Sequence, residues 1–225
     1  MILTKEHRTP ARLGRVLGAV LCGASVVSLT AAAQTPEEGQ ALIQSFLDEV
    51  TTLKASFAQT LLDEQYQVLA GPETGTLAIS RPGRFRWDYR EPAERLIIAD
   101  GTRLWMYEPD LDQVIVRNLD TTLASTPAML LSGEGGLSSG YEIISVFSTD
   151  EIVWVELRPK VDETDFETLR LGFVERELAM MDLVDRFGQT THLEFNDVER
   201  NVQLDEDTFD FSPPEGADVI GDTGF

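Results

Sequence analysis

The apolar residues of this chain follow two different periods, one near its beginning and another from Ala55 onward. Between residues 35 and 54 they recur at steps of three and four, which predicts one amphipathic helix. These positions are Ile43, Phe46, Leu47, Val50 and Leu53. Thr35 suits the N-cap, and Pro36 followed by two glutamates is typical of a first turn. We expect the helix to end between Thr51 and Lys54 and to pack on a sheet.

From Ala55 onward the apolar residues alternate with polar ones, which is typical of half-buried β-strands. Glycines, acids and other turn-forming residues separate the alternating segments. These segments include ASFAQTLL, GTLAIS, RLIIAD, TRLWMY, DQVIVRNL, YEIISVF, EIVWVELRPK, TLRLGFVE, ELAMMDLVDRF and TTHLEFNDVE. Such a run of antiparallel hairpins with few helices predicts a mainly β, α+β fold built as a sheet or an open barrel.

The segment RLIIADGTRLWMY reads as a hairpin, because Asp100-Gly101 is a pair that tolerates a type I′ turn. A two-residue loop at this pair would place Ile98 opposite Arg103 and Ile97 opposite Leu104. One face of the hairpin then carries Ile97, Leu104 and Met106. The other face carries Leu96, Ile98, Trp105 and Tyr107. Since both faces are apolar, we predict that this part of the sheet is covered on both sides.

In the segment LAISRPGRFRWDY, residues 77–89, a permanent cation shares its parity with large apolar side chains. The odd-numbered positions are Leu77, Ile79, Arg81, Phe85, Trp87 and Tyr89. In one continuous strand, Arg81 would lie on the same face as these residues. Alternatively, Pro82-Gly83 bends or bulges the strand, and one extra residue would place Arg81 and Phe85 on opposite faces. Parity alone leaves both arrangements open.

The segment Asn118 to Gly140, NLDTTLASTPAMLLSGEGGLSSG, shows no alternation. A cap at Ser125 or Thr126, with Pro127 after it, predicts one or two short helices. Their residues Ala128, Met129, Leu130 and Leu131 are apolar on nearly every side. Two interpretations are equally consistent with this composition. The helix is either a lid over an apolar cavity or a crossover segment that caps the end of the sheet.

The N-terminal residues resemble a secretory signal. A basic start is followed by an apolar stretch and by Ala31-Ala32-Ala33, which predicts cleavage before Gln34. An uncleaved anchor is the alternative. Lipid attachment at Cys22 is not expected, because Leu21 stands where that processing requires a small residue. The mature chain would be one domain, residues 34–225, with 192 residues and no cysteine to form a disulfide.

Removing residues 1–33 makes the chain more acidic. They contain four of the 18 Lys and Arg and one of the 39 Asp and Glu, which leaves 14 against 38 and a net charge of −24. Such a surface favours solubility and repels both nucleic acid and anionic membranes.

The predicted mature chain offers few groups for catalysis. His192 is its one histidine, and its place in an alternating strand is typical of a surface or hydrogen-bonded residue. The sequence contains no G-x-S-x-G motif, and after residue 33 no cysteine. Asp205, Asp207 and Asp210 lack the glycine and the terminal glutamate of a calcium loop. We predict a protein that is not an enzyme, needs no metal or cofactor, and binds an apolar ligand.

Four blocks of the sequence together resemble the LolA family of periplasmic outer-membrane lipoprotein carriers. They are ISRPGRFRWDYREP, IIADGTRLWMYEPDLDQVIV, TPAMLL and FDFSPPEGADVI. The resemblance implies an incomplete, strongly curved antiparallel β-barrel with an apolar concave cavity closed by short α-helices. It also implies a periplasmic, monomeric carrier without a cofactor. Its cargo would be triacylated lipoproteins released by an ATP-driven transporter of the inner membrane and delivered to an acceptor lipoprotein on the outer membrane.

The resemblance also assigns roles to individual residues. Arg81 matches an arginine thought to hold the lid closed until cargo displaces it, and Phe85 matches a functional phenylalanine. We expect Trp87 and Ile97 on the cavity wall with them. On the lid side we expect Met129, Leu130 and Leu131. Each of these could instead be an ordinary core residue, and Ala128 is smaller than the residue often found at its position.

Two other functions remain open on the sequence. One is a periplasmic lipid-binding or signalling sensor protein on the same scaffold. The other is a secreted hydrolase, against which the single histidine argues because hydrolysis needs a nucleophile and a base close together.

Overall fold

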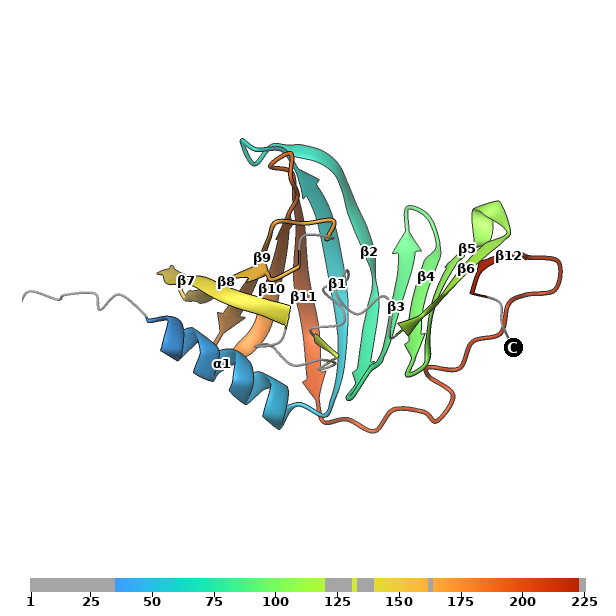
Figure 1. Ribbon diagram of the computed structural model, residues 1–225, viewed down its shortest axis with the longest axis horizontal. Coiled ribbons are helices and arrows are strands. Elements are labelled where there is room, and N and C mark those ends of the chain that lie inside the picture. The colour runs from blue at the N-terminus through green and yellow to red at the C-terminus, as the bar shows by residue number, and fades with distance from the viewer. Residues whose placement is uncertain (1–34, 120–130, 133–139, 162–163, 223–225) are drawn as a thin grey trace, which may run out of the picture. The chain divides into compact units, whose positions relative to one another are not determined.

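One β-sheet of twelve strands dominates the computed structural model, which describes residues 35–119, 131–132, 140–161 and 164–222 (Figure 1). All of these residues lie in the unit formed by Ala33–Phe225. The predicted signal sequence, residues 1–33, falls outside the described residues and stays a prediction. Among the described residues, no helix is long and apolar enough to cross a membrane.

The elements follow one another in a simple order along the chain. Helix α1 (Pro36–Glu49) comes first, and a short 3-10 helix (Pro109–Leu111) lies between β5 and β6. The strands are β1 (Thr52–Leu62), β2 (Val68–Ser80), β3 (Arg84–Glu91), β4 (Arg95–Asp100), β5 (Arg103–Glu108), β6 (Gln113–Asn118), β7 (Tyr141–Thr149), β8 (Ile152–Pro159), β9 (Thr168–Val174), β10 (Glu177–Val184), β11 (Thr190–Arg200) and β12 (Asp218–Gly221).

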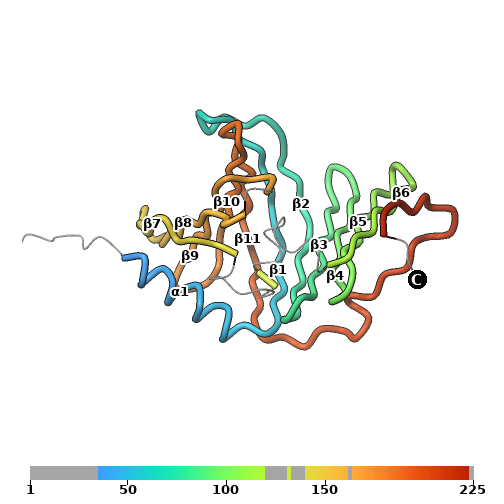
Figure 2. The backbone as a smooth tube through the Cα atoms, in the orientation of Figure 1, coloured from blue at the N-terminus to red at the C-terminus, as the bar shows by residue number. Residues whose placement is uncertain are grey.

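The strand order is β12-β6-β5-β4-β3-β2-β1-β11-β10-β9-β8-β7. Neighbouring strands are antiparallel except β12 and β6, which run parallel. β1 pairs with both β2 and β11, so it joins the first half of the chain to the second (Figure 2). The sheet is curved, and its edges β12 and β7 do not pair with each other. This arrangement confirms the predicted mainly β fold with an incomplete antiparallel barrel.

Helix α1 begins as predicted but ends earlier. Thr35 and Glu38 form a reciprocal capping box, in which each side chain accepts from the other residue's backbone N–H. The helix ends at Glu49, and Leu53, predicted as its last apolar position, belongs to β1. The reason is local, because Val50, Thr51 and Thr52 are β-branched residues that favour extended backbone.

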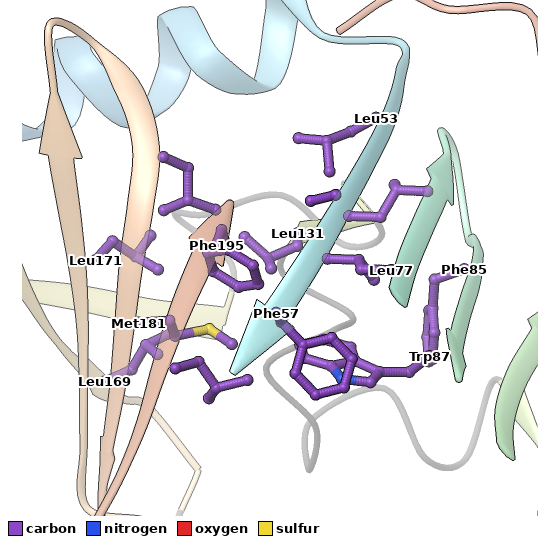
Figure 3. Close-up of a cluster of buried hydrophobic side chains, with 14 of the residues drawn as sticks. Leu53, Phe57, Leu77, Phe85, Trp87, Leu131, Leu169, Leu171, Met181 and Phe195 are labelled. Atoms are coloured by element: carbon purple, nitrogen blue, oxygen red, sulfur yellow. The ribbon is translucent and has the colours of Figure 1, made fainter. Parts of the chain in front are cut away.

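We call the side of the sheet that packs on α1 the inner face, and the opposite side the outer face. Side chains from both halves of the sheet converge on the inner face (Figure 3). Those labelled in the figure are Leu53, Phe57, Leu77, Phe85, Trp87, Leu131, Leu169, Leu171, Met181 and Phe195. Phe46 of α1 joins them through an edge contact with Phe173 of β9, at 5.9 Å between ring centroids. The inner face is therefore one continuous apolar core.

The outer face of β4, β5 and β6 carries a second apolar cluster. It is formed by Ile98, Trp105, Val114 and Val116. The C-terminal segment covers it, with Phe211 packing against the ring of Trp105 at 5.6 Å. The prediction that this part of the sheet is covered on both sides is confirmed.

The β4–β5 hairpin has a different register from the one predicted. Ile98 lies opposite Trp105 and Ile97 opposite Met106, so the turn is formed by Gly101 and Thr102. Asp100 stays in β4 because its carboxylate accepts from the backbone N–H groups of Thr102 and Arg103. The register differs by two residues, which is the period of a strand, so each side chain keeps its predicted face.

On the outer face of β7 to β11, polar residues stand directly opposite one another across five strands. This row consists of Ser145, Glu156, Arg170, Asp182 and His192. Arg170 donates to Glu156 at 3.0 Å, and His192 Nδ1 lies 2.5 Å from Asp182 Oδ1. Of the alternatives that the sequence left open for His192, the structure shows a hydrogen-bonded residue whose partners are carboxylates.

A substitution at Gly39 tests whether α1 packs closely against β7 and β8. A Cβ atom at this position would lie 2.4 Å from Val146 Cγ2 of β7 and 3.2 Å from Val155 Cγ1 of β8. We expect Gly39→Leu to lower the free energy of unfolding by about 1–3 kcal/mol, although leucine is the better helix former. Denaturant unfolding measures this. Gln40→Leu, at the exposed neighbouring position, should leave stability nearly unchanged. A Gly39→Leu protein as stable as the wild type would contradict this seating of α1.

His192 makes stability depend on pH. The hydrogen bond to Asp182 raises the pKa of His192 above its usual value of about 6.5, against the effect of burial, and Glu194 adds to the rise. The stabilisation is therefore complete below about pH 6.5 and is lost as pH increases through the raised pKa. We expect the stability difference between wild type and His192→Gln to shrink with increasing pH in that range. A difference that stays constant from about pH 5.5 to 9 in denaturant titrations would refute this.

Candidate functional site

The segment from Leu77 to Tyr89 is a hairpin, not one strand. β2 and β3 are joined by a three-residue turn, Arg81-Pro82-Gly83, with Gly83 at φ +74°. Ile79 lies opposite Phe85 and Leu77 opposite Trp87. Directly opposite residues share a face, so all four are on the inner face. The continuous strand is therefore wrong, and the change of direction expected at Pro82-Gly83 is a complete reversal of the chain.

Arg81 projects from the turn to the C-terminal end of α1. Its Nη1 donates to the carbonyl oxygens of Phe46, at 2.9 Å, and Leu47, at 3.0 Å, and also to that of Val50. Its Nε donates to the carbonyl oxygen of Leu131 at 2.8 Å. We call this set of contacts the Arg81 clamp. It joins α1, the β2–β3 turn and the segment at Leu131.

The end of a helix is a suitable partner for a cation. The last carbonyls of α1 have few donors within the helix, and that end carries a partial negative charge. The guanidinium also lies over the ring of Phe46, 4.7 Å from its centroid. Burial lowers the pKa of Arg81 to about 10, and Asp48 opposes the shift. Arg81 therefore stays charged at neutral pH and continues to need acceptors.

Asn201 holds the same end of α1 from the other side, which the sequence did not reveal. Its Nδ2 donates to the Glu49 carbonyl at 2.9 Å, and its Oδ1 accepts from the Thr51 N–H at 2.8 Å. Asn201 follows β11, 150 positions after Thr51 in the chain. No local pattern links these two positions, because only the pairing of β1 with β11 brings them together.

The structure gathers the predicted cavity residues that it describes. Phe85, Trp87 and Leu131 belong to the inner core with exposed fractions of 1%, 6% and 1%, and Ile97 packs against it. Met129 and Leu130 lie outside the described residues. The shared location is therefore observed for part of the set, whereas a role in acyl-chain binding stays a prediction for all of it.

A cluster of aromatic side chains on the inner face includes residues that were not among the predicted cavity residues. The ring of Phe57 lies 5.4 Å from that of Trp87 and 5.0 Å from that of Tyr89, in edge contacts. Phe195 of β11 also contacts Trp87, with 6.3 Å between the ring centroids. The alternation in β1 and β11 predicted strands there, but it could not show that both phenylalanines meet Trp87.

The described side chains of the inner face are buried against one another and against α1, whose C-terminal end the Arg81 clamp holds. A cavity of about 660 Å³ lies elsewhere, between the outer face and residues 203–208. Its lining contains charges of both signs, including Lys54, Arg86, Asp88 and Asp197, so it does not suit an apolar ligand. Among the described residues, no group of three or more His, Cys, Asp or Glu could hold a metal ion.

The Arg81 clamp can be tested by amide exchange. Arg81→Leu removes the donors to the last carbonyls of α1, and hydrogen bonds to charged groups contribute about 1.5–3 kcal/mol. We expect the amide hydrogens in the last turn of α1 to exchange about 10- to 100-fold faster with deuterium. Arg90→Leu is the control, because the Arg90 side chain is 61% exposed and pairs with Asp88. Unchanged exchange in α1 would show that the clamp does not hold the helix.

Comparison with known proteins shows that the chain is similar to the members of one protein family. The family model described as outer membrane lipoprotein carrier protein LolA matches residues 48–212. The chain is 42% identical over 189 residues to the outer-membrane lipoprotein carrier protein of Nitrosospira multiformis, covering 84% of this chain and 91% of that protein. It is also 42% identical over 181 residues to the protein of that name from Nitrosomonas europaea, covering 80% and 87% of the two chains.

A solved structure resembles the fold. The crystal structure of an uncharacterized conserved protein from Thermus thermophilus superposes with a TM-score of 0.51 at 12% identity. The match covers 81% of this chain and 98% of that one. At this identity the likeness concerns the architecture alone.

Proposed function

The chain belongs to the family of outer membrane lipoprotein carrier proteins, LolA, and from this premise we propose how it carries its cargo. It is a periplasmic carrier of outer-membrane lipoproteins, and carriage requires no bond to be made or broken. The acyl chains of the cargo enter the inner face after α1 and the segment at Leu131 separate from Arg81. The observation that carries this proposal is the Arg81 clamp across a continuous apolar core.

The physical task explains why the protein needs such an interior. Each methylene group of an acyl chain costs about 0.8 kcal/mol when it is exposed to water. Three chains contain dozens of methylene groups, so a triacylated protein does not cross an aqueous space unaided. An inner face with aliphatic and aromatic side chains from both halves of the sheet replaces water around those chains.

The clamp makes binding reversible. In the closed protein, the inner face buries its own side chains and Arg81 satisfies the helix carbonyls. Cargo has to supply enough apolar contact to offset the loss of these hydrogen bonds. The affinity for cargo is therefore lower than its apolar area alone would give, and release restores the clamp.

The cargo is loaded and unloaded by membrane partners. An ATP-driven transporter of the inner membrane supplies the lipoprotein, and an acceptor lipoprotein on the outer membrane receives it. The signal sequence at residues 1–33 exports the chain, and the mature protein acts as a monomer. Its net charge of −24, from 14 Lys and Arg against 38 Asp and Glu, keeps it away from anionic membranes between the two steps.

The catalytic alternative gains no support from the geometry. His192 lies on the outer face, between Asp182 and Glu194, and is not part of the apolar core. A hydrolase would need a nucleophile beside such a base.

A transfer assay tests the proposal. Inner-membrane vesicles that contain the transporter and a labelled lipoprotein are incubated with ATP and the wild-type protein. We expect a soluble one-to-one complex with intact cargo, which then passes the label to outer-membrane vesicles. Absence of soluble label, or cleaved cargo, would refute the carrier function.

The same assay measures the two steps separately for Arg81→Leu. Loss of the clamp destabilises the empty closed state relative to the loaded one, so uptake should persist or increase while hand-over decreases. Arg90→Leu should match the wild type in both steps. Normal uptake and normal hand-over in a folded Arg81→Leu protein would show that the clamp does not control transfer.

A further inference from the structure

Three buried side-chain N–H groups have no hydrogen-bond partner among the described residues. They are Nε1 of Trp87, Nη2 of Arg81 and Nε of Arg95. The guanidinium of Arg95 already pairs with Glu73 and stacks on Tyr89. Buried polar groups in folded proteins are almost always paired, so each exception requires an explanation.

Trp87 is the clearest of these exceptions. Its side chain is 6% exposed and is in edge contact with the rings of both Phe57 and Phe195. Figure 3 shows the indole extending from β3 toward Phe57 of β1. A phenylalanine would fill a wholly apolar site without leaving a donor unpaired. Tryptophan normally occurs where its N–H can reach an acceptor.

Trp105 shows how the same chain treats a tryptophan on the other face. Trp105 is also buried, and its Nε1 donates to Asp100 Oδ2 at 2.8 Å. The fold therefore pairs the indole N–H of Trp105 with an acceptor from the protein. The inner face offers Trp87 apolar neighbours and no acceptor within the described residues.

The cargo of a lipoprotein carrier contains hydrogen-bond acceptors that could pair with these N–H groups. The acyl chains on a glyceryl group are attached through ester linkages, and an ester carbonyl accepts hydrogen bonds but donates none. When the chains enter an apolar interior, this carbonyl loses its water and needs a donor. The inner side has unpaired donors, Trp87 Nε1 and Arg81 Nη2, and the ligand has unpaired acceptors.

We propose that Nε1 of Trp87 donates a hydrogen bond to an ester carbonyl of the cargo's acyl linkage. The carrier then recognises how the chains are attached as well as their apolar length. The inference rests on the proposed function, since it assigns a polar contact to the same interior. It also explains why this position of β3, in contact with two phenylalanines, carries a tryptophan.

The test compares two synthetic lipopeptides that differ only in the linkage. One carries two chains on a glyceryl group through esters, and the other carries chains of equal length through ethers, which lack the carbonyl oxygen. Binding of each lipopeptide is measured by calorimetry for wild type and Trp87→Phe. We expect Trp87→Phe to bind the ester probe about 3- to 10-fold more weakly and the ether probe within about twofold of wild type.

Trp105→Phe is the matched control, because it removes an indole N–H on the outer face. It should leave both affinities unchanged. Circular dichroism and amide exchange show whether each variant retains the fold. Arg81→Leu is not used here, since it also opens the clamp.

The possible outcomes distinguish failure of the donor role of Trp87 from failure of the carrier function. If Trp87→Phe weakens both probes equally, the indole contributes packing and the donor role is wrong. If it weakens neither, the indole N–H does not contribute to binding, and the donor role is again wrong while the carrier function stands. If the wild-type protein binds neither probe, the proposed function itself fails.

Discussion

The hydrogen bonds of the half-buried Arg81 guanidinium are the interaction on which the arrangement of the closed molecule depends. The guanidinium meets carbonyl oxygens at the end of α1 and at Leu131, and so connects segments that are distant in the sequence. Arginine cannot relieve its burial by losing its proton at neutral pH, so it must keep acceptors. A clamp made of hydrogen bonds to backbone carbonyls is also reversible, because those carbonyls can return to water or to other donors.

The Arg81 clamp holds α1 over the inner face of the sheet, and the rest of the fold serves to form and cover that face. A sheet with two unpaired edges curves around an apolar inner face, and α1 covers that face between Gly39, close to β7 and β8, and the clamp at its C-terminal end. Covering the inner face by a helix, and not by closing the barrel, leaves an element that can move without breaking strand pairs. The outer face differs in character, with a charged row over β8 to β11 and an apolar cluster under the C-terminal segment.

The features of the fold that depend on residues close together in the sequence could be predicted from it. The capping box of α1 depends on residues within one turn, and the two faces of β4 and β5 depend on a period of two. The register of that hairpin was wrong by two residues, because the side chain of Asp100 bonds two backbone N–H groups beyond it. The helix end was also predicted too late, since apolar periodicity does not distinguish Leu53 of a strand from a last helical turn.

By itself, the sequence determined the β-rich class, the N-terminal helix, the acidic charge and the resemblance that led to the family, because each depends on composition or on residues close together in the chain. Only the tertiary structure decided where Arg81 points, which carbonyls it meets, and that Asn201 holds the same helix end. It also decided that Trp87 has a buried N–H without a described partner while Trp105 has Asp100. These facts depend on strand order and on a three-residue turn, which bring distant residues together and which no local pattern encodes.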